Sequence, residues 1–318
     1  MRPAFVALFA VAAAGISAAA TAPTTAPPTT APCGRVAAGN TTITTRQGNL
    51  RRTAIVHVPT GYSGKKAVAL VLDLHGSGST ADQQRLFSGM SKTANADGFV
   101  VAYPQGAIPD GSGFDWNVPG QPLVGGRRVP AGAPSDVAFV NDLITILRGS
   151  YCVDSHRIYA TGFSGGARLV SELGCALSGR LAAIAPVGGL RFPSGCHAVR
   201  AVPVIAFHGT ADPIDPYRGH GQPYWRYSVP DAAKRWAARD GCRPSPAVSR
   251  PAATVTLSRY GGCRNGAAVE LYTIAGEGHE WPGGPTLPPV LTRLLGPQSS
   301  AVDANAVMWK FFTAHPLG

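Results

Sequence analysis

Charged residues are scarce in this sequence: only 14% of its 318 residues are Asp, Glu, Lys or Arg. Acidic residues are the rarer kind, 17 against 28 basic ones, so the formal net charge is +11. The basic residues are dispersed and form no stripe with aromatic residues, which argues against a nucleic-acid partner. We interpret the positive charge as a surface property that keeps the protein dissolved, with attraction to an acidic polysaccharide as the alternative.

Features that identify several other protein classes are also missing. No Cys-x-x-Cys pair occurs, so a zinc ribbon or a thioredoxin-like site is not expected. No phosphate loop of the G-x-x-x-x-G-K type and no metal-ligand spacing is present. Beyond the N-terminal segment, no uncharged run is long enough to span a membrane. We therefore expect no metal, no cofactor and no stable membrane association.

The N-terminus has the pattern of a secretory signal peptide. Arg2 is followed by an apolar stretch over residues 4–16 and by small residues over 18–22. Cleavage after Ala20 is favoured over cleavage after Ala22, which would leave a proline at the new N-terminus. The sequence thus predicts a signal peptide at 1–20, a Thr/Pro-rich linker at 21–32 and one catalytic domain at 33–318.

Six cysteines follow the predicted signal peptide. An even number in an exported chain predicts three disulfides. Two of the six flank one loop-rich segment and are expected to pair with each other, Cys242 with Cys263. The other four allow three pairings, between which the sequence does not decide. These four are Cys33, Cys152, Cys175 and Cys196.

Apolar runs alternate with helical patterns along the domain. The runs suit strands that are buried on both faces, preceded by one hairpin. The expected strands are residues 41–45, 52–58, 67–74, 98–103, 157–161, 182–187, 202–207 and 268–274. The expected helices are residues 81–97, 137–148, 165–177, 230–239 and 301–315. This order predicts an α/β fold with a mostly parallel sheet flanked by helices, whose chemistry lies at the carboxyl ends of the strands.

The motif Gly-Phe-Ser-Gly-Gly follows the expected strand at 157–161 and opens a helical stretch. This is the G-x-S-x-G nucleophile turn in its strand–turn–helix setting. Glycines on both sides of the serine let a sharp turn expose the hydroxyl without steric clashes. The motif predicts Ser164 as the nucleophile of an α/β hydrolase.

A serine needs an imidazole to take its proton and a carboxylate to orient that imidazole. In this fold the chain order is Ser, then Asp or Glu, then His. Asp212 follows the expected strand at 202–207, and His279 follows the last expected strand. We predict Asp212 as the acid and His279 as the base. Asp215 is the local competitor of Asp212, and His208 is expected to have a structural role.

The loop that starts at His75 follows another buried strand, where this fold supplies an oxyanion donor. The two predicted donors are the backbone N–H groups of Ser77 and Gly165. Aromatic residues are candidates for the pocket walls, and the one nearest the predicted base, Trp281, is the strongest. The candidates are Tyr103, Trp116, Trp225 and Trp281.

Five segments carry a resemblance to a known family: LDLHGSGST, YCVDSHRIYATGFSGGA, APVGGL, AFHGTADPIDPY and GEGHEWPGG. Together they resemble the secreted feruloyl esterase / polyhydroxybutyrate depolymerase-like α/β hydrolases, related to carbohydrate esterase family 1. The resemblance implies an eight-stranded sheet, structural cysteines and a metal-free acyl-enzyme mechanism. It places the nucleophile, acid and base at Ser164, Asp212 and His279, and the oxyanion donors at Ser77 and Gly165.

The resemblance also limits the substrate. Polymer-degrading members usually carry an extra substrate-binding module after a linker, and no second linker is present here. We therefore expect a secreted monomer that hydrolyses small or polymer-attached esters, with feruloyl or other phenolic esters of plant polysaccharide first. The alternatives are oligo-3-hydroxybutyrate and, through the same acyl-enzyme, acyl transfer to cell-envelope sugars.

Overall fold

A computed structural model describes residues 36–219 and 224–318 of the chain. The predicted signal peptide, the Thr/Pro-rich linker and Cys33 lie outside the described residues. No helix within the described ranges is long and apolar enough to cross a membrane.

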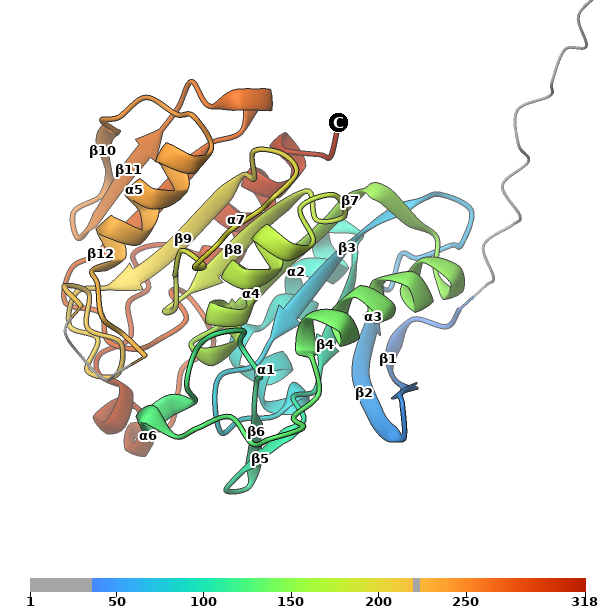
Figure 1. The fold of residues 1–318 in the computed structure, drawn as a ribbon. Coiled ribbons are helices and arrows are strands. Elements are labelled where there is room, and N and C mark those ends of the chain that lie inside the picture. Colours follow the sequence, from blue (N-terminus) through green and yellow to red (C-terminus); the bar gives the residue numbers. More distant parts are fainter. Residues whose placement is uncertain (1–35, 220–223) are drawn as a thin grey trace, which may run out of the picture. The chain divides into compact units, whose positions relative to one another are not determined.

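Ten strands of the described chain form one sheet, in the order β1-β2-β4-β3-β7-β8-β9-β12-β11-β10 (Figure 1). They are β1 (Gly39–Gln47), β2 (Leu50–Val58), β3 (Val68–Leu74), β4 (Val100–Pro104), β7 (Val153–Phe163), β8 (Ala183–Val187), β9 (Val204–Gly209), β10 (Ala247–Ala252), β11 (Val255–Tyr260) and β12 (Val269–Ile274). The six strands from β4 to β12 in this order run parallel. A small separate hairpin pairs β5 (Ile108–Asp110) with β6 (Gly113–Asp115).

The parallel centre of the sheet confirms the predicted fold class. Its strands could be predicted because they are short apolar runs that are buried on both faces. Every residue of β8 is buried, for example. The implied number of eight strands is wrong: β10 and β11 extend the sheet beyond β12 as an antiparallel pair. Neither strand was predicted. Most of β10 is exposed, and only the first and last residues of β11 are buried, so both lack the continuous apolar run by which the eight predicted strands were recognised.

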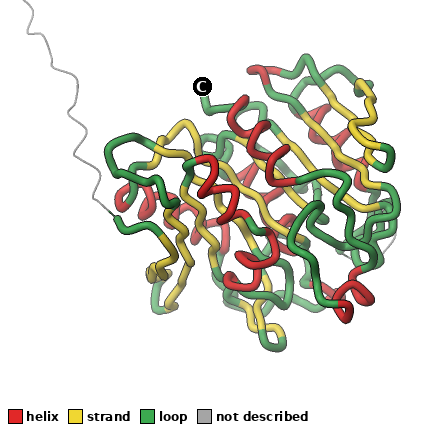
Figure 2. The backbone as a smooth tube through the Cα atoms, turned by 180° about the vertical axis from the view of Figure 1, so that it is seen from behind, coloured by secondary structure: helices red, strands yellow, loops and turns green. Residues whose placement is uncertain are grey.

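Helices cover both faces of the sheet (Figures 1 and 2). One face packs against α3 (Asp136–Ser150), α4 (Gly165–Ala176) and α5 (Val229–Arg239). The other packs against α1 (Ala81–Ser88), α2 (Met90–Asp97) and α7 (Ala304–Ala314). A further short helix, α6 (Pro289–Leu295), was not predicted.

The helix predicted over residues 81–97 is in fact two helices. Thr80 begins α1 with a capping box, in which its side chain accepts from the backbone N–H of Gln83. Gly89 then takes the left-handed conformation, with φ 62°, and ends α1. This turn separates α1 from α2, which buries Met90 and Ala94 in the packing on that face of the sheet.

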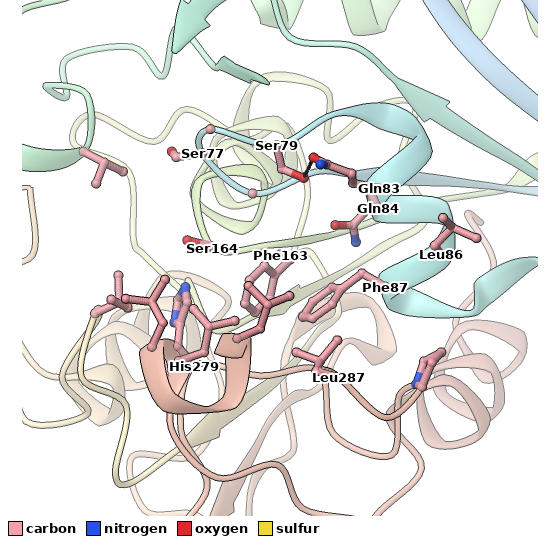
Figure 3. Close-up of a pocket in the computed structure, with 18 of the residues that line it drawn as sticks. Ser77, Ser79, Gln83, Gln84, Leu86, Phe87, Phe163, Ser164, His279 and Leu287 are labelled. Atoms are coloured by element: carbon pink, nitrogen blue, oxygen red, sulfur yellow. Dashed lines mark hydrogen bonds between the residues drawn. The ribbon is translucent and has the colours of Figure 1, made fainter. Parts of the chain in front are cut away.

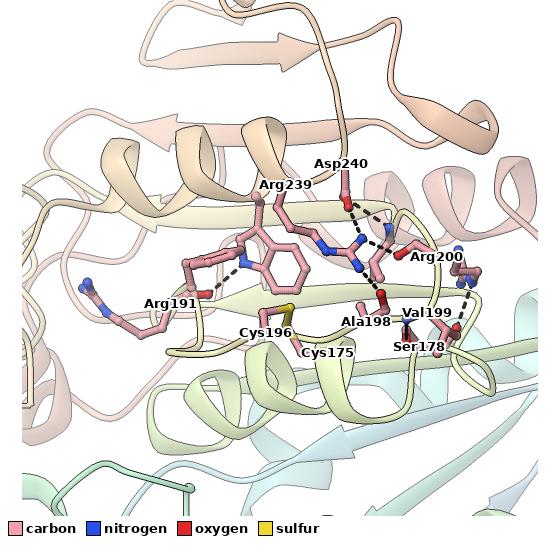
Figure 4. Close-up of a disulfide and its surroundings, with 12 residues drawn as sticks. Cys175, Ser178, Arg191, Cys196, Ala198, Val199, Arg200, Arg239 and Asp240 are labelled. Carbon is pink, nitrogen blue, oxygen red and sulfur yellow. Dashed lines mark hydrogen bonds and ion pairs between the residues drawn. A yellow bond between two sulfur atoms is a disulfide. The ribbon is translucent and has the colours of Figure 1, made fainter.

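Two disulfides join described residues. Cys242 pairs with Cys263, as the sequence predicts. Cys175 pairs with Cys196, which selects among the pairings left open and ties α4 to the segment that precedes β9 (Figure 4). Cys152 is also disulfide-bonded.

Removing the Cys175–Cys196 bond is expected to lower the free energy of unfolding by about 3 kcal/mol. The two cysteines are separated by 21 residues, so the bond restricts a loop of that length in the unfolded chain. Urea unfolding of a Cys175→Ala/Cys196→Ala variant measures the loss. The Cys242–Cys263 bond has the same separation of 21 residues and supplies a matched variant that should lose a similar amount. A loss below about 1 kcal/mol in both would contradict the entropic account.

Candidate active site

Ser164 lies in a sharp turn between the end of β7 and the start of α4. Its φ is 52° and its ψ is −116°, a positive-φ conformation that is strained for a residue with a side chain. The turn is held by backbone hydrogen bonds on both sides: Ser164 N–H donates to Val187 O at 3.0 Å, and Ser164 O accepts from Arg168 N–H at 3.0 Å. This is the geometry that the G-x-S-x-G motif predicts, with the serine at the edge where the parallel strands end.

The glycine after the serine is required by a close approach of two segments. A Cβ atom at Gly165 would lie 2.3 Å from Ser77 Oγ and 3.0 Å from Ser77 N. The start of α4 and the loop after β3 therefore meet directly beside the serine. This brings together the two residues whose backbone N–H groups the sequence predicts as oxyanion donors, at the positive end of a helix.

His279 and Asp212 form a hydrogen bond, with 2.7 Å between His279 Nδ1 and Asp212 Oδ2. Asp212 follows β9 and His279 follows β12, and these strands are parallel neighbours, so both loops leave the same edge of the sheet. With its Nδ1 hydrogen directed at a carboxylate, the imidazole keeps Nε2 free to accept a proton. The Phe163 ring packs against the imidazole, with 4.6 Å between the ring centroids.

The competing carboxylate, Asp215, does not take this position. Asp212 Oδ1 accepts backbone hydrogen bonds from Ile214 at 2.8 Å and from Asp215 at 2.7 Å. His208 Nε2 lies 3.2 Å from Asp212 Oδ2 and 2.8 Å from the backbone oxygen of Asp215. The structure thus places His208 in a supporting position behind the pair, and it surrounds both carboxylate oxygens of Asp212 with donors.

This environment separates the pKa values of the pair. Burial alone would raise the pKa of Asp212, but the adjacent His279 and His208 outweigh burial and hold that pKa well below its usual range. Burial alone would lower the pKa of His279, but the Asp212 carboxylate and the negative charges of Asp215 and Glu280 raise it above 6.5. The arrangement therefore favours an ionised acid beside a histidine of increased basicity.

The raised pKa of His279 predicts an acid limb in the pH profile. The histidine must be neutral to accept a proton, so kcat/KM should fall tenfold per pH unit below a midpoint that lies above pH 6.5. A pH titration of kcat/KM measures it, with circular dichroism to exclude unfolding. Burial also raises the pKa of Glu280, to about 7, so Glu280→Gln is the control. The limb should persist in that variant, and its disappearance would assign it to Glu280 instead.

The four aromatic residues proposed as pocket walls do not line the pocket among the described residues. Each is at most 2% exposed, and each uses its polar atom in an internal hydrogen bond. They are Tyr103, Trp116, Trp225 and Trp281. Trp281, the strongest candidate, donates to Asn305 on α7 at 2.9 Å. The physical reason is that these large rings fill the packing between sheet, loops and helices, where burial stabilises them most.

Ser164 and His279 instead open onto a pocket of about 710 Å³ (Figure 3). One wall comes from the loop after β3 and from α1, which contributes Phe87. The opposite wall comes from the segment around Leu287 and from α6. The sequence analysis missed these residues. For the leucines, the sequence feature that could have indicated them is the helical spacing of Leu287, Leu291 and Leu294 within a proline-bounded segment.

Comparisons with known proteins identify the family of the chain. Residues 53–217 match the family model described as Esterase PHB depolymerase. Feruloyl esterase B of Piromyces equi is 33% identical over 239 residues, which are 72% of this chain and 42% of that enzyme. Poly(3-hydroxyalkanoate) depolymerase C of Paucimonas lemoignei is 25% identical over 269 residues, 76% of this chain and 61% of that enzyme. The chain thus spans about half the length of these two relatives.

A solved structure shares the fold. The acetyl xylan esterase from Aspergillus awamori superposes with a TM-score of 0.60 and 15% sequence identity. The match covers 86% of this chain and 99% of that enzyme. At this identity the similarity shows the α/β-hydrolase fold alone.

Proposed function

Because the chain belongs to the esterase PHB depolymerase family, we propose that it is a secreted serine carboxylesterase with Ser164 as nucleophile, His279 as base and Asp212 as acid. The observation that carries the proposal is the 2.7 Å hydrogen bond between His279 and Asp212 at the pocket that Ser164 lines. Secretion is supported by the N-terminal signal pattern and by the disulfides, which suit an oxidising compartment.

The reaction follows from the roles of these side chains. His279 Nε2 takes the proton of Ser164 Oγ as the oxygen attacks the ester carbonyl. The backbone N–H groups of Ser77 and Gly165 bind the oxygen that becomes negative. His279 then returns the proton to the departing alcohol, which leaves an acyl group on Ser164. Water, deprotonated by the same histidine, releases the acid and restores the enzyme.

For the acyl group we propose a feruloyl or related phenolic acid of plant polysaccharide. The pocket is mainly apolar, as an aromatic acid requires, and the rings of Phe87 and Phe163, with centroids 4.7 Å apart, line it together with Ser164 (Figure 3). Gln83 and Gln84 add the few polar groups that could orient ring substituents. The similarity to a protein named feruloyl esterase supports the same substrate class.

Oligo-3-hydroxybutyrate is the second candidate, and the aliphatic side of the pocket favours it. Leu287, Leu291 and Leu294 present branched alkyl groups rather than rings to the site. Such a wall suits a short branched hydroxyacyl unit as well as it suits an aromatic ring.

The ratio of kcat/KM for methyl ferulate and for a 3-hydroxybutyrate trimer separates the two candidates. We expect the ferulate ester to be preferred by at least tenfold, and Ser164→Ala serves as the blank. A preference for the trimer would make the enzyme a depolymerase of soluble or loosened chains. Turnover of neither ester above the blank would reject both substrate classes.

A further inference from the structure

Exposed apolar side chains gather at the mouth of the pocket. Seven large hydrophobic residues are exposed among the described residues, and four of them belong to α1 and α6. Leu86 on α1 is 58% exposed, while Val290, Leu291 and Leu294 on α6 are 60%, 39% and 62% exposed. Three of these four, all but Val290, also line the pocket that holds Ser164. Exposed apolar groups that are contiguous with a pocket mark a binding surface.

Helix α6 is attached to the loop that carries His279 rather than to the core. None of its residues is buried. Its C-terminal end is held instead by the base: His279 N–H donates to Leu295 O at 2.5 Å, and Gly278 N–H donates to Pro297 O at 2.7 Å. The backbone of the predicted base therefore sets the position of the helix, which fixes its leucine side chains relative to the reacting atoms.

The chemistry of this wall is aliphatic. We name it the leucine wall, formed by Leu287, Leu291 and Leu294. Apart from His279, no ionisable side chain lines the pocket within the described ranges. A charged ligand would thus find no partner here, whereas each methylene laid against the leucines would leave water.

We propose that the leucine wall binds an aliphatic chain, several methylenes long, that is part of the ester substrate. The inference rests on the proposed function and refines its substrate class. The chain can belong to the acid or to the alcohol of the ester, since both parts are attached to the carbonyl carbon that Ser164 attacks. An alkyl ester of a phenolic acid would contact the rings of Phe87 and Phe163 and the leucine wall together.

Two homologous series test the proposal, both used below their aggregation concentrations. The acid arm is 4-nitrophenyl acetate to octanoate, and the alcohol arm is methyl to octyl ferulate. A half-buried methylene should raise kcat/KM roughly twofold, or roughly 60-fold from acetate to octanoate. A rise in either arm supports the proposal and identifies the side that carries the chain.

Substitutions in the leucine wall test whether it causes the rise of kcat/KM with chain length. In Leu291→Gln/Leu294→Gln, the ratio of kcat/KM for the longest and shortest esters should fall about tenfold. The matched control is Val248→Gln, because Val248 on β10 is 63% exposed and lies outside the pocket lining. It should leave every ester unchanged.

The outcomes separate the wall from the triad. If kcat/KM did not change with chain length in either arm, while Ser164→Ala abolished turnover, the proposal for the leucine wall would be overturned. The proposed esterase function would be retained. A chain-length rise that survives the double substitution would overturn the proposal for the leucine wall as well. Absence of turnover with every ester would reject the proposed function itself.

Discussion

Replacing Ser164 with alanine is expected to lower kcat by roughly a million-fold without changing the fold. The other groups of a triad act only through the nucleophile, so its removal costs about as much as removal of the whole triad. The substitution removes one oxygen atom and should preserve the turn, which is held by backbone hydrogen bonds to Val187 and from Arg168. Single-turnover and steady-state hydrolysis of 4-nitrophenyl acetate measure the loss.

A serine on the helix that follows Ser164 supplies the control. Ser171 is buried in α4, where its hydroxyl donates to Ala167 O and accepts from Arg191 N–H. Ser171→Ala should cost about 1 kcal/mol of stability and leave turnover nearly unchanged. A fluorophosphonate probe should label the parent protein at Ser164 and should fail to label Ser164→Ala. A natively folded Ser164→Ala variant that keeps most of its activity would remove Ser164 from the mechanism.

Asp212→Asn is expected to lower kcat by roughly ten-thousand-fold. The amide keeps the shape of the carboxylate, but its single oxygen is held by the backbone N–H groups of Ile214 and Asp215, so its NH2 group faces His279 Nδ1. It also carries no charge to stabilise the positive imidazolium. The wrong tautomer then places a hydrogen on Nε2, where the serine proton must arrive. Since the Asp212 carboxylate raises the pKa of His279, the acid limb of any residual activity should also move to lower pH.

Asp215→Asn is the matched comparison, three residues along the same loop. Asp215 is equally buried, but the hydrogen bond to His279 belongs to Asp212. We expect Asp215→Asn to change kcat by less than tenfold, because it alters only a more distant charge on His279. Thermal melts of both variants separate lost turnover from lost folding. If Asp215→Asn proved the more damaging, the acid of the triad would have to be reassigned.

Much of the candidate site could be located from local sequence because its residues follow strand ends. Parallel strands bring their carboxyl ends to one edge, so a serine after β7, an aspartate after β9 and a histidine after β12 meet there. Continuous apolar runs in the sequence indicate buried strands, as in β8, and these strands were predicted. Strands β10 and β11 were missed because few of their residues are buried and neither forms a continuous apolar run.

The sequence by itself therefore determined the fold class, the family, the strand ends that hold Ser164, Asp212 and His279, and the pairing of Cys242 with Cys263. Only the tertiary structure decided the pairing of Cys175 with Cys196 and the identity of the pocket walls. The reason is that a wall depends on which distant segments pack together. Whether an aromatic ring such as Trp281 faces a pocket or the core is settled by its neighbours in space. The leucines of α6 line the same pocket as Ser164, and the backbone of His279 holds the C-terminal end of that helix.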